Sequence, residues 1–503
     1  MRIATGHGGR FPLVDSMRGL AALSIVALHI SFANGLARDG VLAPYAARLE
    51  VGVAVFFLIS GFLLYRPFAA SRLERERRPR TAAYAWRRLL RIGPAYWVAL
   101  TVLALLAGAK IVLEDPLLFY GFAQVYDRYT ALSFDGFLQA WTLCVEVSFY
   151  VFLPVWALLM RALPVRGRRS WLATELVALA VLAAIGVAYK LVVLDTGDAT
   201  SPALLWLPAF LDQFALGMAL AVLSVWWQDR PLPALLQPLD RLPGIAWVLA
   251  LVAFWAVSTQ IGIGGGFATF TENSWMARHL LFAAVALLVL LPVIFGDQAR
   301  GVLRRVLRAR VLVFLGVVSY GIYLWHLGVI VQLQRLGLEP ATSAAPIRLV
   351  LYPALIVLAT VAVATVSYLA IERPALSLKA RVSHVKTLEA GSRLSYGLRY
   401  QLDHRATIAT VPIGYADGVP RNLAAVGGEV VIGGRRRPVA GTVTMDQLMV
   451  DVGDATVEVG DEVVLLGRDG DAEITADEWA DRLGTIGYEI VCGIGRRVPR
   501  TYV

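Results

Sequence analysis

The sequence has few cysteines and few charged residues, and both shortages limit what the protein can be. Among its 503 residues there are two cysteines, Cys144 and Cys492, too few for a disulfide framework. Charged residues make up 17% of the chain, below the roughly 25% of average soluble domains. Hydrophobic residues make up 58%, and the mean hydropathy is +0.64. A single soluble globule is therefore excluded.

Long apolar stretches fill the first three quarters of the chain. A membrane-spanning helix needs roughly 20 apolar residues. Candidates lie near 12–35, 47–65, 92–109, 137–160, 171–193, 203–226, 244–263, 277–296, 311–333 and 348–371. The first run is longer than the core of a signal peptide, and no small-residue cleavage site follows it. We expect an α-helical polytopic membrane domain with about ten transmembrane helices in the lipid bilayer.

Basic residues concentrate in alternate loops. The loops after the second, fourth, sixth and eighth stretches hold 20 Lys and Arg, and the intervening loops, together with the adjoining ends of the stretches, hold 8. Because cytoplasmic loops carry the Lys/Arg excess, both termini are predicted to be cytoplasmic in a multi-pass protein of the cell membrane. The same bias explains the net charge of +10, so we expect no nucleic-acid partner.

Three ionisable side chains stand out inside the predicted spans: His29, Glu146 and His326. Each costs at least ~2.5 kcal/mol in hydrocarbon, so its presence needs a reason. Helix rise places both histidines in the outer half of the membrane and Glu146 near its midplane. Two histidines and a carboxylate form a general acid/base set that could meet in one cavity. The alternative is that they join helices by buried hydrogen bonds.

Arg18 precedes His29 by 11 residues, so the two side chains project from one face of a helix, about 16 Å apart along its axis. Arginine near the cytoplasmic end suits a phosphate-bearing ligand, and histidine deeper in the membrane suits proton transfer. Snorkelling of Arg18 to the membrane surface is the alternative.

Several motifs together resemble the membrane acyltransferase-3 family over about residues 10–374. They are Arg18–x10–His29, Gly52-Val-Ala-Val-Phe-Phe-Leu-Ile-Ser60-Gly61-Phe62, Arg87-Arg88-Leu-Leu-Arg91-Ile-Gly-Pro94, Trp141-Thr-Leu-Cys-Val-Glu146-Val-Ser-Phe-Tyr150, Ser319-Tyr320-Gly-Ile-Tyr323-Leu-Trp-His326 and Ile371-Glu372-Arg373-Pro374. The resemblance implies a bacterial enzyme of the cell envelope. It would move an acyl group, often acetyl, from a cytoplasmic acyl-CoA-type donor to a hydroxyl of an extracytoplasmic glycan.

The resemblance also implies roles for individual residues. His29 would be the catalytic base, with Glu146 and His326 as supporting catalytic groups. Arg18, Arg88 and Arg91 would bind the donor. For Arg87, Arg88 and Arg91, anchoring of the topology is an equally good interpretation. No metal site is expected.

After Pro374 the pattern changes to short β-branched runs broken by turns. Strands are predicted at 406–411, 429–432, 439–452 and 462–466, with a hairpin at Gly433-Gly434. The segment Thr475-Ala-Asp-Glu478 predicts a helix that stops at Gly484. We therefore divide the chain into a transmembrane domain, residues 1–373, and a small all-β, barrel-like soluble domain, residues 374–503.

The second domain resembles the C-terminal domain of alanine racemases. The resemblance rests on Ser395-Tyr396-Gly397, Thr410-Val-Pro-Ile-Gly-Tyr415-Ala-Asp-Gly418, Thr444-Met445-Asp446-Gln447 and Arg497-Val-Pro-Arg500. It implies that Tyr396 corresponds to a catalytic base that reaches into a partner subunit. Tyr415 would be a substrate-entry residue, and Met445 would lie beside the substrate carboxylate. Half-buried strand aromatics are the alternative for both tyrosines.

The family's lysine-bearing barrel has no counterpart in this sequence. Such racemases hold PLP on a lysine of a (β/α)8 barrel, typically about 250 residues. The chain has four lysines, Lys110, Lys190, Lys379 and Lys386, and none lies in the family's lysine motif. PLP is therefore expected only if a partner barrel supplies the lysine in trans. The other interpretation of the tail is a dimerisation or regulatory module that forms a homodimer.

Overall fold

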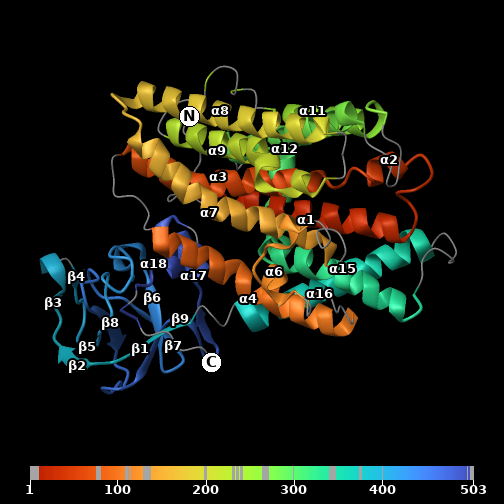
Figure 1. The fold of residues 1–503 in the computed structure, drawn as a ribbon. Coiled ribbons are helices and arrows are strands. Elements are labelled where there is room, and N and C mark those ends of the chain that lie inside the picture. The colour runs from red at the N-terminus through yellow and green to blue at the C-terminus, as the bar shows by residue number, and fades with distance from the viewer. Residues whose placement is uncertain are drawn as a thin grey trace. The chain divides into compact units, whose positions relative to one another are not determined.

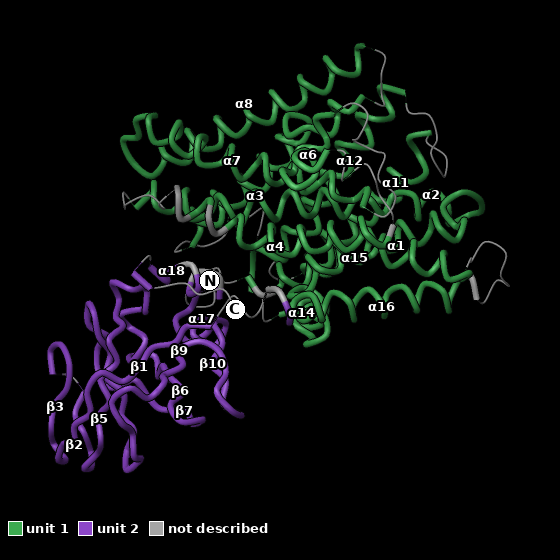
Figure 2. The backbone as a smooth tube through the Cα atoms, turned by 60° about the horizontal axis from the view of Figure 1, so that its bottom comes forward, with its two compact units in different colours: residues 1–4, 11–368 green, residues 5–10, 369–503 purple. Residues whose placement is uncertain are grey.

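The computed structural model describes residues 11–74, 81–107, 112, 115–127, 137–196, 201–228, 233, 237, 242–262, 271–297, 300–338, 347–372, 377–398, 400–485, 487–495 and 497–498. These residues form two compact units, shown in Figure 2. The first is helical and runs from Phe11 to Tyr368, and the second begins at Leu369 and is rich in β-structure.

Each of the ten predicted apolar stretches contains a helix (Figure 1). The helices are α1 (Pro12–Ala33), α3 (Val51–Leu73), α4 (Thr81–Ala107), α7 (Trp141–Ala162), α8 (Arg168–Asp195), α9 (Leu211–Trp226), α11 (Gly244–Thr259), α12 (Glu272–Ile294), the pair α14 (Arg310–Val317) and α15 (Ser319–Arg335), and α16 (Tyr352–Ser367). In the part of the chain described, eight helical segments are long and apolar enough to cross a membrane, or nine with the bent pair as one span. Helix α11, with 16 residues, is shorter.

Short helical turns connect several of these helices. They are α2 (Ala43–Ala46), α6 (Pro116–Tyr120) and the 3-10 turns η1 (Gln124–Tyr126), η2 (Leu138–Ala140), η3 (Pro202–Leu205) and η4 (Leu207–Phe210). Helix α13 (Val302–Leu307) precedes α14. The single π-helical turns η6 (Ile347–Leu351) and η7 (Tyr368–Glu372) flank α16.

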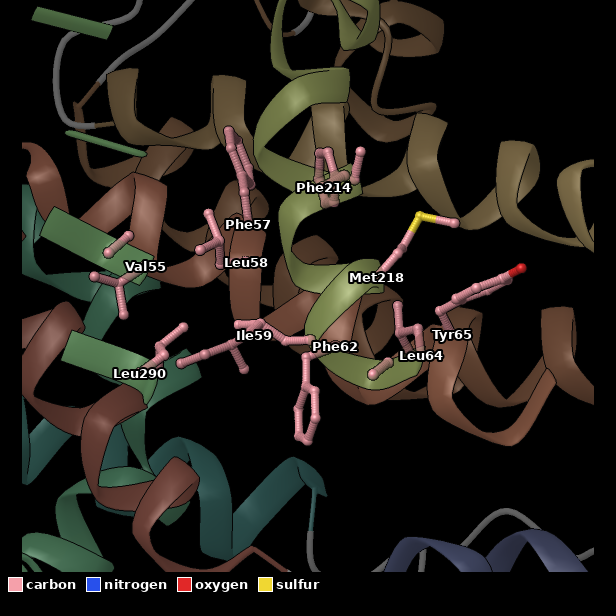
Figure 3. Close-up of a cluster of buried hydrophobic side chains, with 14 of the residues drawn as sticks. Val55, Phe57, Leu58, Ile59, Phe62, Leu64, Tyr65, Phe214, Met218 and Leu290 are labelled. Atoms are coloured by element: carbon pink, nitrogen blue, oxygen red, sulfur yellow. The ribbon is translucent and has the colours of Figure 1, made fainter. Parts of the chain in front are cut away.

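Glycines allow the central helices to approach closely. A Cβ atom on Gly61 of α3 would collide with the carbonyl oxygen of Phe214 in α9, and one on Gly217 would collide with that of Leu58. Small residues are the usual means of close helix packing in membranes, where apolar side chains gain nothing by leaving lipid. Figure 3 shows the core that surrounds this contact. There the rings of Phe57 and Phe149 stack on that of Phe214 at centroid distances of 4.8 and 3.9 Å.

The ninth span is bent by 72° between α14 and α15. The break lies at Val318, where the hydroxyl of Ser319 donates to the carbonyl of Gly316. A glycine and a serine at such a point are a common cause of sharp kinks. The bend sets the direction of α15, the helix that carries His326.

The second unit is built on antiparallel strands. Strands β1 (Leu378–Arg381), β9 (Glu462–Asp469), β6 (Glu429–Ile432) and β7 (Arg435–Pro438) pair in that order, with β10 (Ala472–Ile474) also on β9. A second sheet has the order β2 (His384–Leu388), β5 (Ala406–Val411), β8 (Leu448–Gly453). Strands β3 (Arg393–Leu394) and β4 (Tyr400–Gln401) form a small hairpin. Buried valines of β6, β8 and β9 form the core.

Two local predictions for this unit can be compared with the structure. Helix α17 (Ala476–Leu483) begins after Thr475, whose side chain accepts from the backbone of Glu478, and ends at left-handed Gly484, as predicted. The continuous strand predicted at 439–452 is wrong, because β-structure there is limited to β8 and a single bridge between Val439 and Val450. Gly441, with a φ of 76°, and a turn closed between Thr444 and Gln447 interrupt it. The helix α18 (Gly487–Gly493) follows.

Candidate functional site

The structure brings His29 of α1 and His326 of α15 together. Their imidazole rings lie 5.0 Å apart between centroids, and the Nε2 of His326 is 3.0 Å from the Nδ1 of His29. His326 is fully buried, whereas His29 is half-buried. Two histidines separated by 297 positions in the sequence therefore form one hydrogen-bonded pair.

The hydrogen-bond partners define the tautomer of each ring. The Nδ1 of His326 lies 2.8 Å from the carbonyl oxygen of Tyr323 and 3.2 Å from that of Ile322, so it must donate. A neutral imidazole has one N–H, so the Nε2 of His326 accepts from the Nδ1 of His29, which also faces the carbonyl of Ile25 at 3.0 Å. This arrangement leaves a lone pair on the Nε2 of His29, which has no hydrogen bond from the described residues. That nitrogen is available as a base.

Glu146 lies in a separate polar contact. Its carboxylate accepts hydrogen bonds from the hydroxyl of Ser60 on α3 at 2.7 Å and from that of Tyr150 at 3.3 Å. Of the three ionisable groups expected to meet in one cavity, the structure brings together the two histidines. Within the described residues Glu146 has no hydrogen bond to either of them. Its bond to Ser60 connects α3 with α7, and its bond to Tyr150 lies within α7.

The three arginines expected at the donor end are half-buried on two helices. Arg88 of α4 places its guanidinium 5.8 Å from the centre of the Tyr84 ring. Tyr150 lies within electrostatic range of Arg88 and Arg91 of α4 and of Glu146. We call these four residues the polar string. Arg18 lies on α1, the helix of His29, and has no hydrogen bond or ion pair with the described residues.

A cluster of charged groups in the helical unit was not predicted from the sequence. Lys190 of α8 lies 2.8 Å from the carboxylate of Asp212 on α9 and 2.7 Å from the Nε2 of His279 on α12. The same Nε2 is 2.9 Å from that carboxylate. All three side chains are buried. The sequence did contain a signal for this cluster. Asp212 and His279 fall inside predicted spans, and Lys190 was counted among the basic residues of a loop.

The three tail residues singled out from the sequence are exposed. Tyr396, Met445 and Tyr415 have 53, 48 and 37% of their surface accessible. Tyr396 lies between Ser395 and Leu398, both of which have a positive φ that is unusual outside glycine. For nearby Tyr400, burial and then the carboxylate of Asp451 raise the pKa of the phenol.

Comparison with known families accounts for both units. The family described as "Acyltransferase domain" matches residues 12–372, most of the chain. The chain belongs to this acyltransferase family. With its several long apolar helices, it is a multi-pass membrane protein. The family described as "Alanine racemase, C-terminal domain" matches residues 375–502, so the acyltransferase domain is fused to a racemase-type domain.

Similar individual proteins match the tail of this acyltransferase. An alanine racemase of Symbiobacterium thermophilum is 60% identical over 130 residues, 26% of this chain and 34% of its own length. One of Frankia casuarinae is 53% identical over 131 residues. A solved alanine racemase of Bacillus anthracis with bound L-Ala-P is 45% identical over 25% of this chain and 32% of its own, with a TM-score of 0.24. The chain thus spans about a third of the length of these relatives.

The lysines of the tail do not fit a PLP site. Lys379 on β1 donates to the carboxylate of Glu462 on β9 at 2.6 Å, in an exposed pair. Lys386 lies on β2, opposite Ile408 of β5. Lys379 and Lys386 thus belong to strands of two sheets, whereas Tyr396 lies between β3 and β4 of a separate hairpin. The acyltransferase therefore offers, in the residues described, no lysine to bind this cofactor beside Tyr396.

Proposed function

We propose that the helical unit transfers an acyl group, most simply acetyl, from a cytoplasmic acyl-CoA-type donor to a hydroxyl of a cell-envelope glycan. The observation that carries the proposal is the His29–His326 pair. Within an apolar bundle, it presents one nitrogen lone pair whose orientation is set by hydrogen bonds on the other side of the ring. Membership of the acyltransferase family supports the reaction class.

The transfer step follows from this tautomer. The Nε2 of His29 takes the proton of the acceptor hydroxyl while the hydroxyl oxygen bonds to the carbonyl carbon of the donor thioester. The carbon–sulfur bond then breaks, and His29 returns the proton to the leaving thiolate. During the step the Nδ1–H of His29 continues to donate to His326 and to Ile25, which stabilises the imidazolium. His326 acts as a positioning residue in this scheme.

The donor would be held at the other end of the polar string. Arg18, Arg88 and Arg91 supply guanidinium groups, which bind phosphate oxygens through paired N–H donors. Arg18 shares a helix with His29, and Arg88 and Arg91 lie within electrostatic range of Tyr150, which donates to Glu146. Glu146 would keep α3 and α7 in register through its bond to Ser60.

The test uses His29→Ala in membranes of the source cells, which contain the natural acceptor. Transfer of a labelled acyl group into the envelope fraction should fall by about 10²-fold or more, because a positioned general base typically contributes that much. Expression and membrane insertion are checked in parallel. The matched control is His384→Ala, an exposed histidine on β2 of the tail, which should keep full activity. Full activity of His29→Ala would disprove the assignment.

A second function is favoured by the tail alone. Tyr396, Tyr415 and Met445 are all accessible, as a surface that completes another polypeptide's site would require. In this alternative the protein is a component of a membrane alanine or serine racemase whose PLP barrel is supplied in trans, or the tail is a module for dimerisation or regulation. In the racemase case the partner would hold PLP, and the tail would contribute Tyr396 to the partner's site.

A further inference from the structure

One connection of the helical unit combines exposed apolar side chains with exposed arginines. It comprises residues 300–317, which include helices α13 and α14. Between 301 and 317 the sequence contains four arginines and no acidic residue. The connection belongs to the basic set of loops, which the sequence predicts to be cytoplasmic. The way in which it is held against the bundle determines which of its side chains face outward.

Helix α13 is fixed to α12 through Arg304. This arginine is fully buried, and its guanidinium donates to three backbone carbonyls at or just past the end of α12, at 2.9, 2.9 and 3.0 Å. The carbonyls belong to Pro292, Phe295 and Asp297. The end of a helix is a favourable place for a positive charge, because the helix dipole is negative there. The hydroxyl of Ser16 in α1 donates to the carbonyl of Leu307, so α13 has a defined orientation against both α1 and α12.

The outward face of α13 is apolar. Val302, Leu303 and Val306 have 72, 49 and 51% of their surface accessible. Arg304 follows Val302 by two residues, a rotation of about 200°, so a buried Arg304 directs Val302 away from the bundle. In a multi-pass membrane protein, an exposed apolar surface of this kind is suited to contact with the acyl chains of lipid.

Two exposed arginines border this surface, Arg305 on α13 and Arg310 at the start of α14. Neither side chain has a hydrogen bond or ion pair with the described residues. Phe314 and Val317 of α14 are exposed as well. They follow Arg310 by four and seven residues, so they project within about 40° of it. This face of α14 thus begins with a guanidinium and continues with apolar side chains for about 10 Å.

We propose that this connection binds an anionic phospholipid, with the phosphate at Arg305 and Arg310 and an acyl chain along Phe314 and Val317. Guanidinium groups bind phosphate oxygens through paired N–H donors. Basic residues beside membrane-spanning helices attract lipids of net negative charge, whereas a zwitterionic lipid offers no net charge. The exposed apolar side chains favour a lipid over a water-soluble phosphate compound such as the acyl-CoA-type donor.

Two electrostatic features support an anionic occupant. The nearest acidic residue in the sequence, Asp297, already pairs with Arg300 at 3.2 Å. Arg310 is the first residue of α14, where a positive side chain opposes the helix dipole. A bound phosphate would therefore compensate charge that the neighbouring residues leave unbalanced.

A lipid at this place would support the helices that carry the histidine pair. A Cβ on Gly316 of α14 would collide with the carbonyl of Asp15, so α14 packs tightly on α1, the helix of His29. Helix α14 also leads directly into α15, the helix of His326. The lipid would stabilise this junction and would take no part in acyl transfer itself.

The test compares the lipid contacts of two exposed apolar surfaces in the full chain. The purified protein is reconstituted into dioleoylphosphatidylcholine vesicles that contain a trace of photoactivatable phosphatidylglycerol or phosphatidylcholine, each with a diazirine in one acyl chain. After illumination, labelled peptides are quantified by mass spectrometry. Helix α11 is the reference, because its Val248, Leu251 and Val252 are exposed and no charged residue occurs between 242 and 262.

Relative to α11, we expect residues 311–317 to be labelled at least about fivefold more by phosphatidylglycerol than by phosphatidylcholine. The double variant Arg305→Gln with Arg310→Gln should abolish this preference. The control, Arg166→Gln with Arg169→Gln, removes two exposed arginines of another basic connection and should retain it.

Equal labelling by the two lipids in the unaltered chain would overturn the proposal. Loss of the preference in the control variant would do so too, since it would indicate a diffuse attraction by all basic loops. Displacement of phosphatidylglycerol by excess acetyl-CoA would replace the lipid with the donor as the occupant of these arginines. The comparison in the unaltered chain needs neither a substitution nor turnover, so its outcome is independent of the proposed reaction, which His29→Ala tests.

Discussion

His326 differs from His29 in that both of its ring nitrogens are engaged. Its Nδ1 donates to backbone carbonyls and its Nε2 accepts from His29. His326 can affect transfer only through His29, because both of its own ring nitrogens already take part in hydrogen bonds. In the proposed mechanism its role is to keep the hydrogen of His29 on Nδ1 and the lone pair on Nε2.

This role predicts an order among substitutions of His326. A glutamine retains an oxygen that can accept from His29, whereas a leucine of similar size does not. His326→Gln should therefore keep a substantial part of the acyl-transfer rate, and His326→Leu should lose roughly 10²-fold, the typical worth of a positioned base. The measurement is the rate of transfer at saturating donor together with the donor KM, which should stay constant in both. Equal rates in the two variants would contradict the hydrogen-bond role.

How far single residues could be predicted depended on how unusual each was in its surroundings. His29 and His326 stood out as ionisable groups in apolar runs, and the structure pairs them. Lys190 was counted with the basic residues of a loop although it falls at the end of the predicted stretch 171–193, and the structure buries it within α8. Its partners Asp212 and His279 lie 22 and 89 positions further along the chain, and a single sequence does not show which spans are neighbours.

At the scale of helices, the cluster of Lys190, Asp212 and His279 joins α8, α9 and α12. Removing one member leaves the opposite charge buried without compensation, which typically costs about 3–5 kcal/mol, whereas replacing a whole buried pair with apolar residues is often neutral. Lys190→Met and Asp212→Leu should each strongly lower the thermal stability of the purified protein in detergent. The double variant should recover most of the loss.

The double-mutant cycle separates this interaction from simple packing. If the cluster were only a set of well-packed side chains, the two losses would add. A matched control is Arg72→Met with Glu175→Leu, another buried ion pair at 2.6 Å, between α3 and α8. It should show a similar coupling and thereby calibrate the method. Additive losses at Lys190 and Asp212 would remove the argument for a coupled cluster.

Element boundaries were predictable where local chemistry defines them. Thr475 and Gly484 delimit α17 because a side-chain cap and a left-handed glycine act within one turn. The break at Val318 was not predicted, because hydropathy does not mark a bend inside a span. The predicted stretch 244–263 likewise runs past Thr259, where α11 ends.

At the scale of the whole molecule, the distribution of basic residues predicts the orientation in the membrane. Reporter fusions at Arg78 and Val503, both outside the described residues, should report the cytoplasm. Fusions at Asp127 and Thr271 should report the exterior, because their loops belong to the set with 8 rather than 20 basic residues. An exterior signal at Val503 would mean an odd number of spans and would place the racemase-type domain outside the cell.

The two fused units predict a separation of activities that can be measured on one purified protein. The full chain in detergent, supplied with PLP, should not convert L-alanine or L-serine to the D-isomer, and it should show no visible absorbance from a lysine-bound cofactor. The physical reason is the missing lysine: Lys379 pairs with Glu462, and the remaining tail lysine lies on a sheet strand. Tyr396 alone can act on one face of a substrate at most, whereas racemisation needs proton transfer on both faces.

The informative arm adds a PLP-barrel protein from the same genome to the full chain. D-isomer formed only in the mixture would favour the second function, provided that it is lost in Tyr396→Phe and kept in Tyr400→Phe, a neighbouring tyrosine that is bonded to Asp451 within its own domain. Loss in both tyrosine variants would point instead to a damaged fold. No activity in the mixture would leave the tail as a dimerisation or regulatory module of the acyltransferase. Racemisation by the unaided chain would show that one of its four lysines binds the cofactor after all.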